Sequence, residues 1–550
     1  MASDKIVPTR EELDAFDLDD PQTVELIQYA RDSHDADAQL TLLGAVKKYR
    51  KACLWAAVLS TSLVMEGYDL VIITSFYGQT QFRNRFGIVD PATGNKVITA
   101  AWQSGLSNSS MVGQLAGLLL NVFAQDRFGN RHTMMAFMAW LVAATFIPVF
   151  APSLPILAFG EAMCGIGWGV FQTLATSYAC EVVPPIVRPY VTAYANMCWG
   201  AGILLSSGVV RAVASIDGDW GWRLPFVIQW VWPVPLIVAA YIAPESPWNS
   251  VRRHREDEAR ASLKRLRQHT PGRDREVDAA LALIVHTMRL EAAETEGSTI
   301  WDCFRGTNLR RTEINCVIWS AQILCGNAIL AYAVVFLEAA GFSELQAFDV
   351  NISLSACYII GGMVCWTLFP RFGRATIYMS GLLFMFLCLV AIGGLGFSSN
   401  RNANIAISVL LILSTLCNMM SIGPVCYPIV SEMPSGRLRY KTIAIGRFVY
   451  NLVGIFANSV TPRMISSLSW NWGAKTGFFY AGTNLLCLIW CWFRLPETKD
   501  RTFGEIDLLF DNKVPARKFK HTVVDQFAHQ PELSDKAAAV AAVEHVDEVA

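Results

Sequence analysis

Long apolar runs recur along most of the 550 residues of the sequence. The hydrocarbon core of a bilayer is about 30 Å thick, and an α-helix of about 20 apolar residues crosses it. Because backbone groups find no water in the hydrocarbon, each run has to satisfy its own hydrogen bonds as a helix. The sequence therefore predicts an all-α integral membrane protein with twelve transmembrane helices. The runs lie near residues 53–77, 102–124, 133–151, 154–179, 190–214, 222–243, 314–338, 347–369, 375–397, 404–430, 440–465 and 475–493.

Charged residues are scarce and unevenly placed. They make up 17% of the chain, whereas soluble domains average about 25%. The formal net charge is -1, which gives no sign of a nucleic-acid partner. The sequence contains no Gly-x-x-x-x-Gly-Lys-Ser/Thr loop, which argues against an ATP-driven pump or another enzyme. Most of the 14 cysteines lie within the apolar runs as small hydrophobic groups, and their spacing indicates no metal site. We also expect no bound cofactor and no obligate protein partner.

The charges also divide the chain into segments. Lys and Arg collect in cytoplasmic loops, and here they favour the even-numbered connections when the N-terminus is cytoplasmic. We therefore predict a multi-pass protein with both termini in the cytoplasm. The predicted segments are an N-terminal cytoplasmic segment (1–52), a six-helix bundle (53–243), a cytoplasmic linker with short helices (244–313), a second six-helix bundle (314–494) and a cytoplasmic tail (495–550).

Three short markers occur twice, in the same order and at equivalent helix ends. RFG at 127–129 returns at 371–373, and PES at 244–246 returns as PET at 496–498, with offsets of 244 and 252 residues. A third marker has an offset of 251 residues and closes the fourth helix (Glu181, Pro184, Arg188) and the tenth helix (Glu432, Pro434, Arg437). A nearly constant offset indicates two duplicated halves. Parallel repeats of this kind place a solute site between them near the middle of the membrane and work by alternating access.

These motifs resemble a known transporter family. The Asp-Arg-x-Gly motif at 126–129, PESPW at 244–248 and PETKDR at 496–501 resemble the sugar porters of the major facilitator superfamily. Five further strings are similar to the fungal maltose-type permeases, which are proton-coupled alpha-glucoside transporters. They are MEGYD at 65–69, GIGWGVFQTL at 165–174, CGN at 325–327, WNWGAKTGFF at 470–479 and FRLPETKDRTFGEIDLLF at 493–510.

The resemblance covers about residues 40–510. It implies the major facilitator fold and a proton symporter that imports an alpha-linked disaccharide such as maltose at the plasma membrane. The implied partners are a small sugar and the lipid bilayer, with the proton as the coupling ion.

Ionisable residues inside the predicted helices are candidates for proton coupling, because a charge there costs about 2.5–3.5 kcal/mol on insertion scales. Glu66 and Asp69 share one face of the first helix, where repulsion favours a proton on one of them. Glu161 in the fourth helix resembles the acid found in the alpha-glucoside branch. Arg447 in the eleventh helix is a cation that could balance an acid. The alternatives are polar groups lining a wet cavity and, for Arg447, a structural ion pair.

A second set of candidates suits a sugar, which offers hydroxyl groups and weakly polar CH faces to amides and aromatic rings. Gln322 and Asn327 match the seventh-helix motif of the resembled family. Each candidate alone also fits a helix–helix hydrogen bond or an interfacial aromatic residue. The full set is Trp199, Gln322, Asn327, Tyr332, Asn418 and Asn451.

Charges at the predicted cytoplasmic helix ends form a third set. The resemblance implies that such groups form salt bridges between the halves and close an inner gate. The alternative is a group of solvated loop charges that follow the positive-inside rule. The residues are Asp126, Arg127, Arg131, Glu181, Arg188, Arg371, Glu432 and Arg437.

Several positions depart from the resembled pattern. Gln114 stands where maltose-type permeases resemble one another in having an acid, and Ile203 stands where sugar porters usually have Gln. Ala333 and Val335 replace polar and aromatic residues after Tyr332. Aliphatic groups suit apolar surface better than hydroxyls, so a divergent transporter of a less polar solute, such as a fungal secondary metabolite, is an alternative. A non-transporting sugar sensor is a minor alternative, because the tail from about residue 511 is short.

Overall fold

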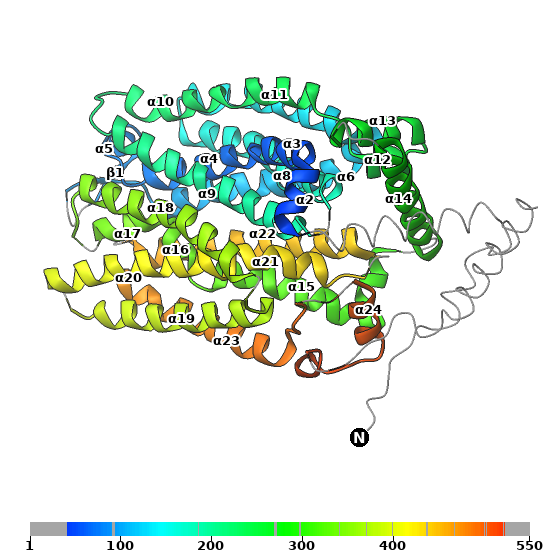
Figure 1. Ribbon diagram of the computed structural model, residues 1–550. Coiled ribbons are helices and arrows are strands. Elements are labelled where there is room, and N and C mark those ends of the chain that lie inside the picture. Colours follow the sequence, from blue (N-terminus) through cyan, green and yellow to red (C-terminus); the bar gives the residue numbers. More distant parts are fainter. Residues whose placement is uncertain are drawn as a thin grey trace, which may run out of the picture.

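Long helices that run roughly parallel to one another form most of the structure (Figure 1). It is a computed structural model that describes residues 41–522, apart from 91–93, 185, 269–271, 296–298, 340, 370, 399, 436–437, 467, 500, 502 and 521. Within these residues, nine helical segments are long and apolar enough to cross a membrane. They are Arg50–Phe76, Arg127–Val149, Leu154–Val182, Trp220–Ile242, Glu344–Leu368, Arg374–Leu395, Asn402–Glu432, Lys441–Ile465 and Gly473–Arg494.

The three remaining predicted runs are helical as well. Run 190–214 is α9 (Arg188–Val213), and run 314–338 lies within α15 to α17 (Gly306–Ala339). Run 102–124 forms the first part of α6 (Ala100–Ala144), whose second part continues into run 133–151. The two parts meet at Gly129, where a φ of 85° suits glycine and bends the chain. The prediction of an all-α membrane protein is confirmed, and the helices are consistent with twelve crossings.

The long helices form two groups that follow the order of the chain (Figure 1). The first group contains α3 (Arg50–Ser60), α4 (Ser62–Phe76), α6, α7 (Phe146–Val149), α8 (Leu154–Val182), α9, α10 (Trp220–Ile228), η2 (Gln229–Val231) and α11 (Pro233–Ile242). The second contains α15 (Gly306–Leu324), α16 (Asn327–Ala331), α17 (Ala333–Ala339), α18 (Glu344–Leu368), α19 (Arg374–Leu395), α20 (Arg401–Met420), α21 (Ile422–Glu432), α22 (Arg439–Ile465), η5 (Gly473–Lys475) and α23 (Thr476–Arg494).

Elements outside the two groups of long helices mark the two ends of the bundle. One end, called here the hairpin end, carries α5 (Thr80–Phe86) and the antiparallel strands β1 (Ile88–Val89) and β2 (Lys96–Val97). The opposite end, called here the linker end, carries the segments between and beside the two groups (Figure 1). These are α2 (Leu42–Lys48), α12 (Pro247–Arg252), α13 (Glu256–Leu266), α14 (Arg273–Thr295), η3 (Ile300–Phe304), α24 (Phe503–Asp511) and η6 (Ala516–Lys518).

Three buried hydrophobic clusters show how the two groups are joined. All residues of one cluster belong to α2, the first group and the linker, from Ala45 to Leu266. A second draws only on the second group and the segment that follows it, from Ile314 to Phe519. The third combines both groups near the hairpin end, where Trp222 of the first lies in one cluster with Leu337 of the second. The halves therefore share an apolar core at the hairpin end, whereas toward the linker end each keeps its own.

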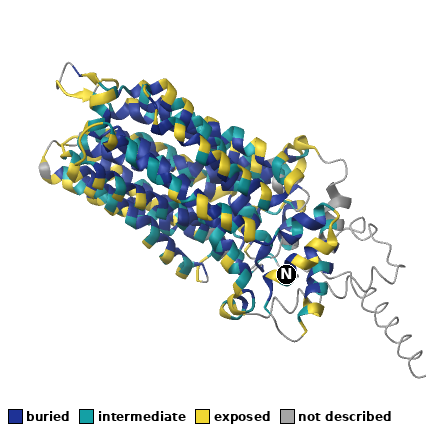
Figure 2. Ribbon diagram, turned by 90° about the horizontal axis from the view of Figure 1, so that it is seen from above, coloured by how far each residue is buried: buried dark blue, intermediate teal, exposed yellow. Residues whose placement is uncertain are grey.

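Large apolar side chains also cover much of the outside of the bundle. Buried residues fill its middle, and exposed residues lie along its surface and at its ends (Figure 2). Exposed apolar area of this extent is unfavourable in water and is covered by hydrocarbon in a bilayer. Examples are Leu119, Phe123, Phe159, Val234, Leu387 and Leu486.

Glycines allow α6 and α8 to pack closely. A Cβ atom on Gly169 would lie 2.2 Å from the carbonyl oxygen of Gln114, and one on Gly165 would lie 2.4 Å from that of Ser110. Gly167 differs, because its nearest neighbour would be at an ordinary 3.7 Å. Small residues of this kind let membrane helices gain van der Waals contact. The sequence predicts such a role for Gly160, Gly165, Gly167 and Gly169.

Gly169→Ala is therefore expected to lower stability, because overpacking costs about 1–3 kcal/mol. The measurement is the melting temperature of the purified protein in detergent. Gly208→Ala is the matched control, since no atom lies within 4 Å of the added Cβ. Equal losses of melting temperature in the two variants would contradict this account of the packing.

Candidate functional site

A chain of hydrogen bonds connects the two halves in the middle of the bundle. Arg447 of α22 donates from Nε to Oε1 of Gln172 in α8 at 2.9 Å. The amide nitrogen of Gln172 in turn donates to a carboxylate oxygen of Glu66 in α4. Glu66 is only 4% exposed, and Arg447 only 9%. Gln172 thus turns its carbonyl oxygen toward the cation and its amide nitrogen toward the acid, which favours both charges.

Aromatic rings surround the Arg447 guanidinium. Its central carbon lies 4.6 Å from the ring centroid of Trp319 and 4.4 Å from that of Tyr450. A desolvated cation–π contact is worth about 2 kcal/mol. Because Glu66 and Gln172 belong to the first half and Arg447 to the second, separating the halves here would leave buried charges without partners.

A second acidic site joins α4 to α8. Asp69 and Glu161 are 2% and 1% exposed, and their carboxyl groups interact directly. Gln229 donates its amide nitrogen to Oδ1 of Asp69. With both acids ionised, Oδ2 of Asp69 and both oxygens of Glu161 would have no hydrogen-bond donor among the described residues. One shared proton supplies a donor and removes the repulsion, so the pair is suited to hold and release a proton.

The two acids of α4 therefore have different neighbours from those expected. The sequence predicts that Glu66 and Asp69 repel one another, whereas in the structure Asp69 contacts Glu161 and Glu66 contacts Gln172. A three-residue spacing fixes a helix face, but the partners come from other helices. Sequence reasoning missed Gln172 and Gln229 as members of the network. The sequence feature that could have identified both residues is an amide side chain within an otherwise apolar run.

The predicted departure at Gln114 also belongs to this network. Its Oε1 accepts from the amide nitrogen of Gln172 at 3.3 Å. Gln172 thus has two acceptors, one of them neutral. An acid at position 114 would add a second negative charge beside Glu66. With the neutral Gln114 in that place, the network carries one negative charge less opposite Arg447.

The seventh and tenth predicted helices are both interrupted beside the network. Gly326, with a φ of 105°, separates α15 from α16, and Ser421 separates α20 from α21. The amide nitrogen of Gln322 donates to the carbonyl oxygen of Gly423 at 2.9 Å and so links the two breaks. Interrupted membrane helices present backbone groups that are not used within the helix, which is typical of transporter solute sites.

Besides Gln322, three of the predicted solute ligands already have protein partners. Asn418 donates to Sγ of Cys325 at 3.3 Å. Tyr332 donates its hydroxyl to Oγ of Ser107, in the other half, at 3.1 Å. The ring of Trp199 lies 5.7 Å from that of Tyr358, again across the halves.

Two asparagines, in contrast, keep amide atoms free. Oδ1 of Asn327 and both amide atoms of Asn451 are buried without a hydrogen-bond partner among the described residues. A buried orphan amide is unfavourable unless a ligand or water completes it. Asn327 and Asn451 are thus the members of the predicted set whose buried amide atoms no described residue pairs.

Ion pairs join the halves at the hairpin end. Arg83 of α5 pairs with Glu338 of α17. Arg211 of α9 pairs with Asp349 of α18 at 2.7 Å. Together with the shared apolar cluster, these contacts close this end of the bundle.

At the linker end, the repeated sequence markers come together within the first half. Glu245 of the PES string accepts from the backbone nitrogens of Asn130 (2.9 Å) and Arg131 (3.2 Å), which follow the RFG string. Glu181 of α8 accepts from the Ser246 hydroxyl and from the Asn130 amide. The three markers thus form one hydrogen-bonded unit.

The second half repeats this unit. Glu497 of the PET string accepts from the backbone nitrogen of Thr376 at 3.3 Å. Glu432 of α21 accepts from the Thr498 hydroxyl and pairs with Arg374 at 3.7 Å. In each half, the glutamate of the PES or PET string thus accepts from the backbone shortly after the RFG string, which supports duplication of one six-helix unit.

The predicted gate acids form their ion pairs within one half or with the linker. Glu181 pairs with Arg252 of α12 at 4.0 Å, and Glu432 pairs with Arg374. The salt bridges between halves that the resemblance implies are not formed by these two acids among the described residues, because neighbours in their own half surround them. Of the other predicted gate residues, Arg188 begins α9, Arg371 is exposed, and Arg127 and Arg131 line a pocket at the linker end. The side chain of Asp126 and the whole of Arg437 lie outside the described residues.

Two membrane-embedded helical halves, a buried ionic network between them and interrupted helices beside it define a secondary membrane transporter. The model of the sugar (and other) transporter family matches residues 53–510. The chain belongs to this family, whose members are transporters and not enzymes.

Relatives and solved structures agree with this assignment. The chain is 39% identical over 531 residues to the general alpha-glucoside permease of Saccharomyces cerevisiae. The aligned region covers 95% of this chain and 86% of the permease. The chain is also 39% identical over 508 residues to the maltose permease MAL61 of Saccharomyces cerevisiae, covering 92% and 83% of the two chains. The solved proton:xylose symporter XylE, bound to 6-bromo-6-deoxy-D-glucose, is 20% identical and matches with a TM-score of 0.70 over 85% of this chain and 100% of its own. At that identity the likeness supports the fold alone.

Arg447→Gln is expected to destabilise the protein by about 3–5 kcal/mol, because it leaves the buried Glu66 carboxylate without a cation. Adding Glu66→Gln should recover part of the loss, since the remaining groups are then neutral amides. Melting temperatures of the two single variants and the double variant measure this coupling. Purely additive losses would show that the two charges do not depend on one another.

Proposed function

We propose that this protein imports an alpha-glucoside such as maltose together with protons, by alternating access to a site between its halves. The family and the named activities of its relatives support the solute class. The observation that carries the coupling is the Glu66–Gln172–Arg447 chain, because it places an acid and a cation on opposite sides of the boundary that must open.

In this proposal, the proton enters when the hairpin end is open and binds to the acids of α4 and α8. The Asp69–Glu161 pair takes one proton, which removes its mutual repulsion. Solute hydroxyls bind Asn327 and Asn451, whose amide atoms lack partners. Closure of the hairpin end by Arg83 and its ion pair then gives the arrangement described above.

We further propose that the protein lies in the plasma membrane with its linker end and both termini in the cytoplasm. The arginines at the linker end support this orientation by the positive-inside rule. In this conformation Glu181 and Glu432 pair with Arg252 and Arg374. We propose that the gate residues named above form salt bridges between the halves in another conformation, in which the linker end is closed.

Asp69→Asn is expected to abolish accumulation of solute against a gradient and to leave exchange of solute across the membrane. The amide removes the titrating group, whereas the fold and the solute site remain. The electrical drive that is lost amounts to about 2.3 kcal/mol per 100 mV for each charge moved. Uptake of radiolabelled maltose by intact cells, with and without internal solute, measures both activities. Thr74→Val, on the same helix and bonded only within it, is the control, and unchanged accumulation in both Asp69→Asn and Glu66→Gln would contradict the proposal.

The solute class is tested by a panel of radiolabelled solutes at two external pH values. Cells without other sugar permeases should take up maltose or a related alpha-glucoside, and more strongly at the lower pH. No uptake of any alpha-glucoside would overturn the sugar proposal. Binding without flux would instead indicate a sensor.

One observation favours a second candidate, a transporter of a less polar solute. Ile203 lies in a small apolar cluster with Tyr358 and Met419, packed against Trp199 and Val71, where the two halves meet. These side chains are buried here, and on separation of the halves they would present an apolar surface that suits an apolar solute face better than a hydroxyl. Altered efflux of a hydrophobic metabolite in the same cells, without alpha-glucoside uptake, would favour this candidate.

A further inference from the structure

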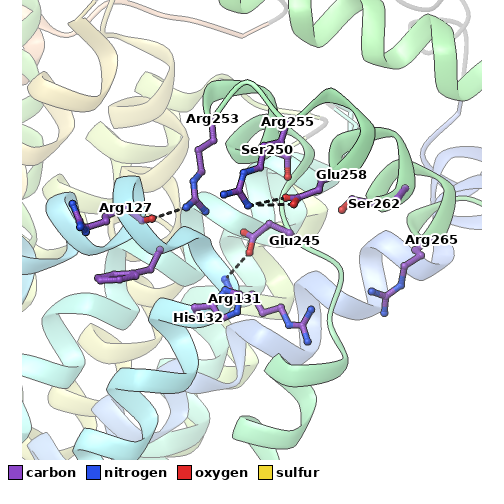
Figure 3. Close-up of a pocket in the computed structure, with 12 residues that line it drawn as sticks. Arg127, Arg131, His132, Glu245, Ser250, Arg253, Arg255, Glu258, Ser262 and Arg265 are labelled. Carbon is purple, nitrogen blue, oxygen red and sulfur yellow. Dashed lines mark hydrogen bonds and ion pairs between the residues drawn. The ribbon is translucent and has the colours of Figure 1, made fainter.

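A basic pocket lies at the linker end, away from the buried ionic network. Its volume is about 510 Å³, within the range of about 300–1,000 Å³ that is usual for small-molecule sites. The bent region of α6, the segment after α11 and helices α12 and α13 form its walls (Figure 3). Its lining includes Arg127, Arg131, His132, Glu245, Arg253, Arg255, Glu258 and Arg265.

The pocket carries more positive charge than its own acids can balance. Five arginines face two glutamates, which leaves a net charge of +3 with neutral His132. Glu245 is occupied by the backbone nitrogens of Asn130, Arg131 and Ser246. Glu258 pairs with Arg255 at 3.2 Å.

The remaining four arginines have no carboxylate partner within 4 Å among the described residues. They are Arg127, Arg131, Arg253 and Arg265. Arg253 and Arg265 each donate to a backbone carbonyl, of Arg127 (2.6 Å) and Ile242 respectively. Nε of Arg131 is buried without a hydrogen-bond partner in the part of the chain that the structure describes. Several guanidinium nitrogens therefore remain available for an anion.

The surroundings of the pocket place it at a membrane surface. The Arg131 guanidinium lies 5.0 Å from the ring centroid of Tyr241. Tyr241, Ile242 and Phe128 are exposed, the last as part of the pocket lining. An aromatic and apolar rim beside cationic groups fits the boundary between lipid headgroups and hydrocarbon.

We propose that this pocket binds a phosphate-bearing anion, held by Arg131, Arg253 and Arg265. Arginine suits phosphate because its planar fork of N–H donors matches two phosphate oxygens. The phosphate can belong to an anionic phospholipid headgroup or to a soluble ion. A bound anion would join α6 to α12 and α13 and so tie the linker to the first half.

The test uses the full-length protein purified in detergent. Native mass spectrometry titrates it with dioctanoyl phosphatidic acid, dioctanoyl phosphatidylcholine and inorganic phosphate. We expect phosphatidic acid to bind the unmodified protein. It should bind the double variant Arg253→Gln with Arg265→Gln about thirtyfold more weakly, given about 1 kcal/mol for each of the two basic residues near an anionic headgroup. Arg305→Gln is the matched control, because its side chain is 78% exposed and lies outside the pocket. It should bind like the unmodified protein.

The arms of the test distinguish the sources of phosphate. Binding of phosphatidic acid without inorganic phosphate indicates a lipid, and equal binding of both indicates a soluble anion. Equal affinity of phosphatidic acid for the unmodified protein and the double variant would overturn the proposal, as would equal affinity for phosphatidylcholine. If the double variant does not fold, the single variant Arg265→Gln provides the same comparison, because Arg265 is exposed and belongs to the proposed site.

Discussion

The buried cation of Arg447 is the constraint on which the centre of this transporter depends. A guanidinium is a permanent cation under physiological conditions, so neighbouring groups have to stabilise its charge when it is buried. The rings of Trp319 and Tyr450 lie against the guanidinium, and Gln172 connects it to Glu66 through two hydrogen bonds. Because this hydrogen-bonded chain crosses from one half to the other, opening the boundary separates the buried charges of Glu66 and Arg447. In the proposed mechanism, a proton on Glu66 or a solute hydroxyl in place of Gln172 lowers this cost.

The rest of the bundle is arranged around that boundary. At the hairpin end the halves share an apolar cluster and ion pairs, so opening this end exposes buried surface and breaks charge contacts. Toward the linker end each half has its own cluster, and Glu181 and Glu432 are satisfied by residues near them. The structure thus combines one firmly joined end with one end where the halves are self-contained.

The fold was predictable to a greater extent than the site. The apolar runs predict each helix because spanning length and backbone satisfaction are local properties of the chain. The repeated markers predict two halves, and their partners in space agree. The neighbours of Asp69 were not predictable, because the contact with Glu161 depends on how α4 and α8 pack. Gln172 and Gln229 look like ordinary polar residues in the sequence, and only their positions beside acids make them part of the network. The partners of Glu181 and Glu432 in this conformation were not predictable for the same reason, since they come from neighbouring segments of the same half or the linker.

Electrogenic solute movement tests the central claim most directly. In proteoliposomes on a solid-supported membrane, addition of maltose should produce a transient current that carries positive charge in the direction of solute flux. The current should grow as the pH on the side of addition is lowered. Its dependence on both maltose and protons would follow from an acid that must be neutralised before the boundary at Arg447 opens. Uptake of radiolabelled maltose without any current, at every pH, would contradict the account.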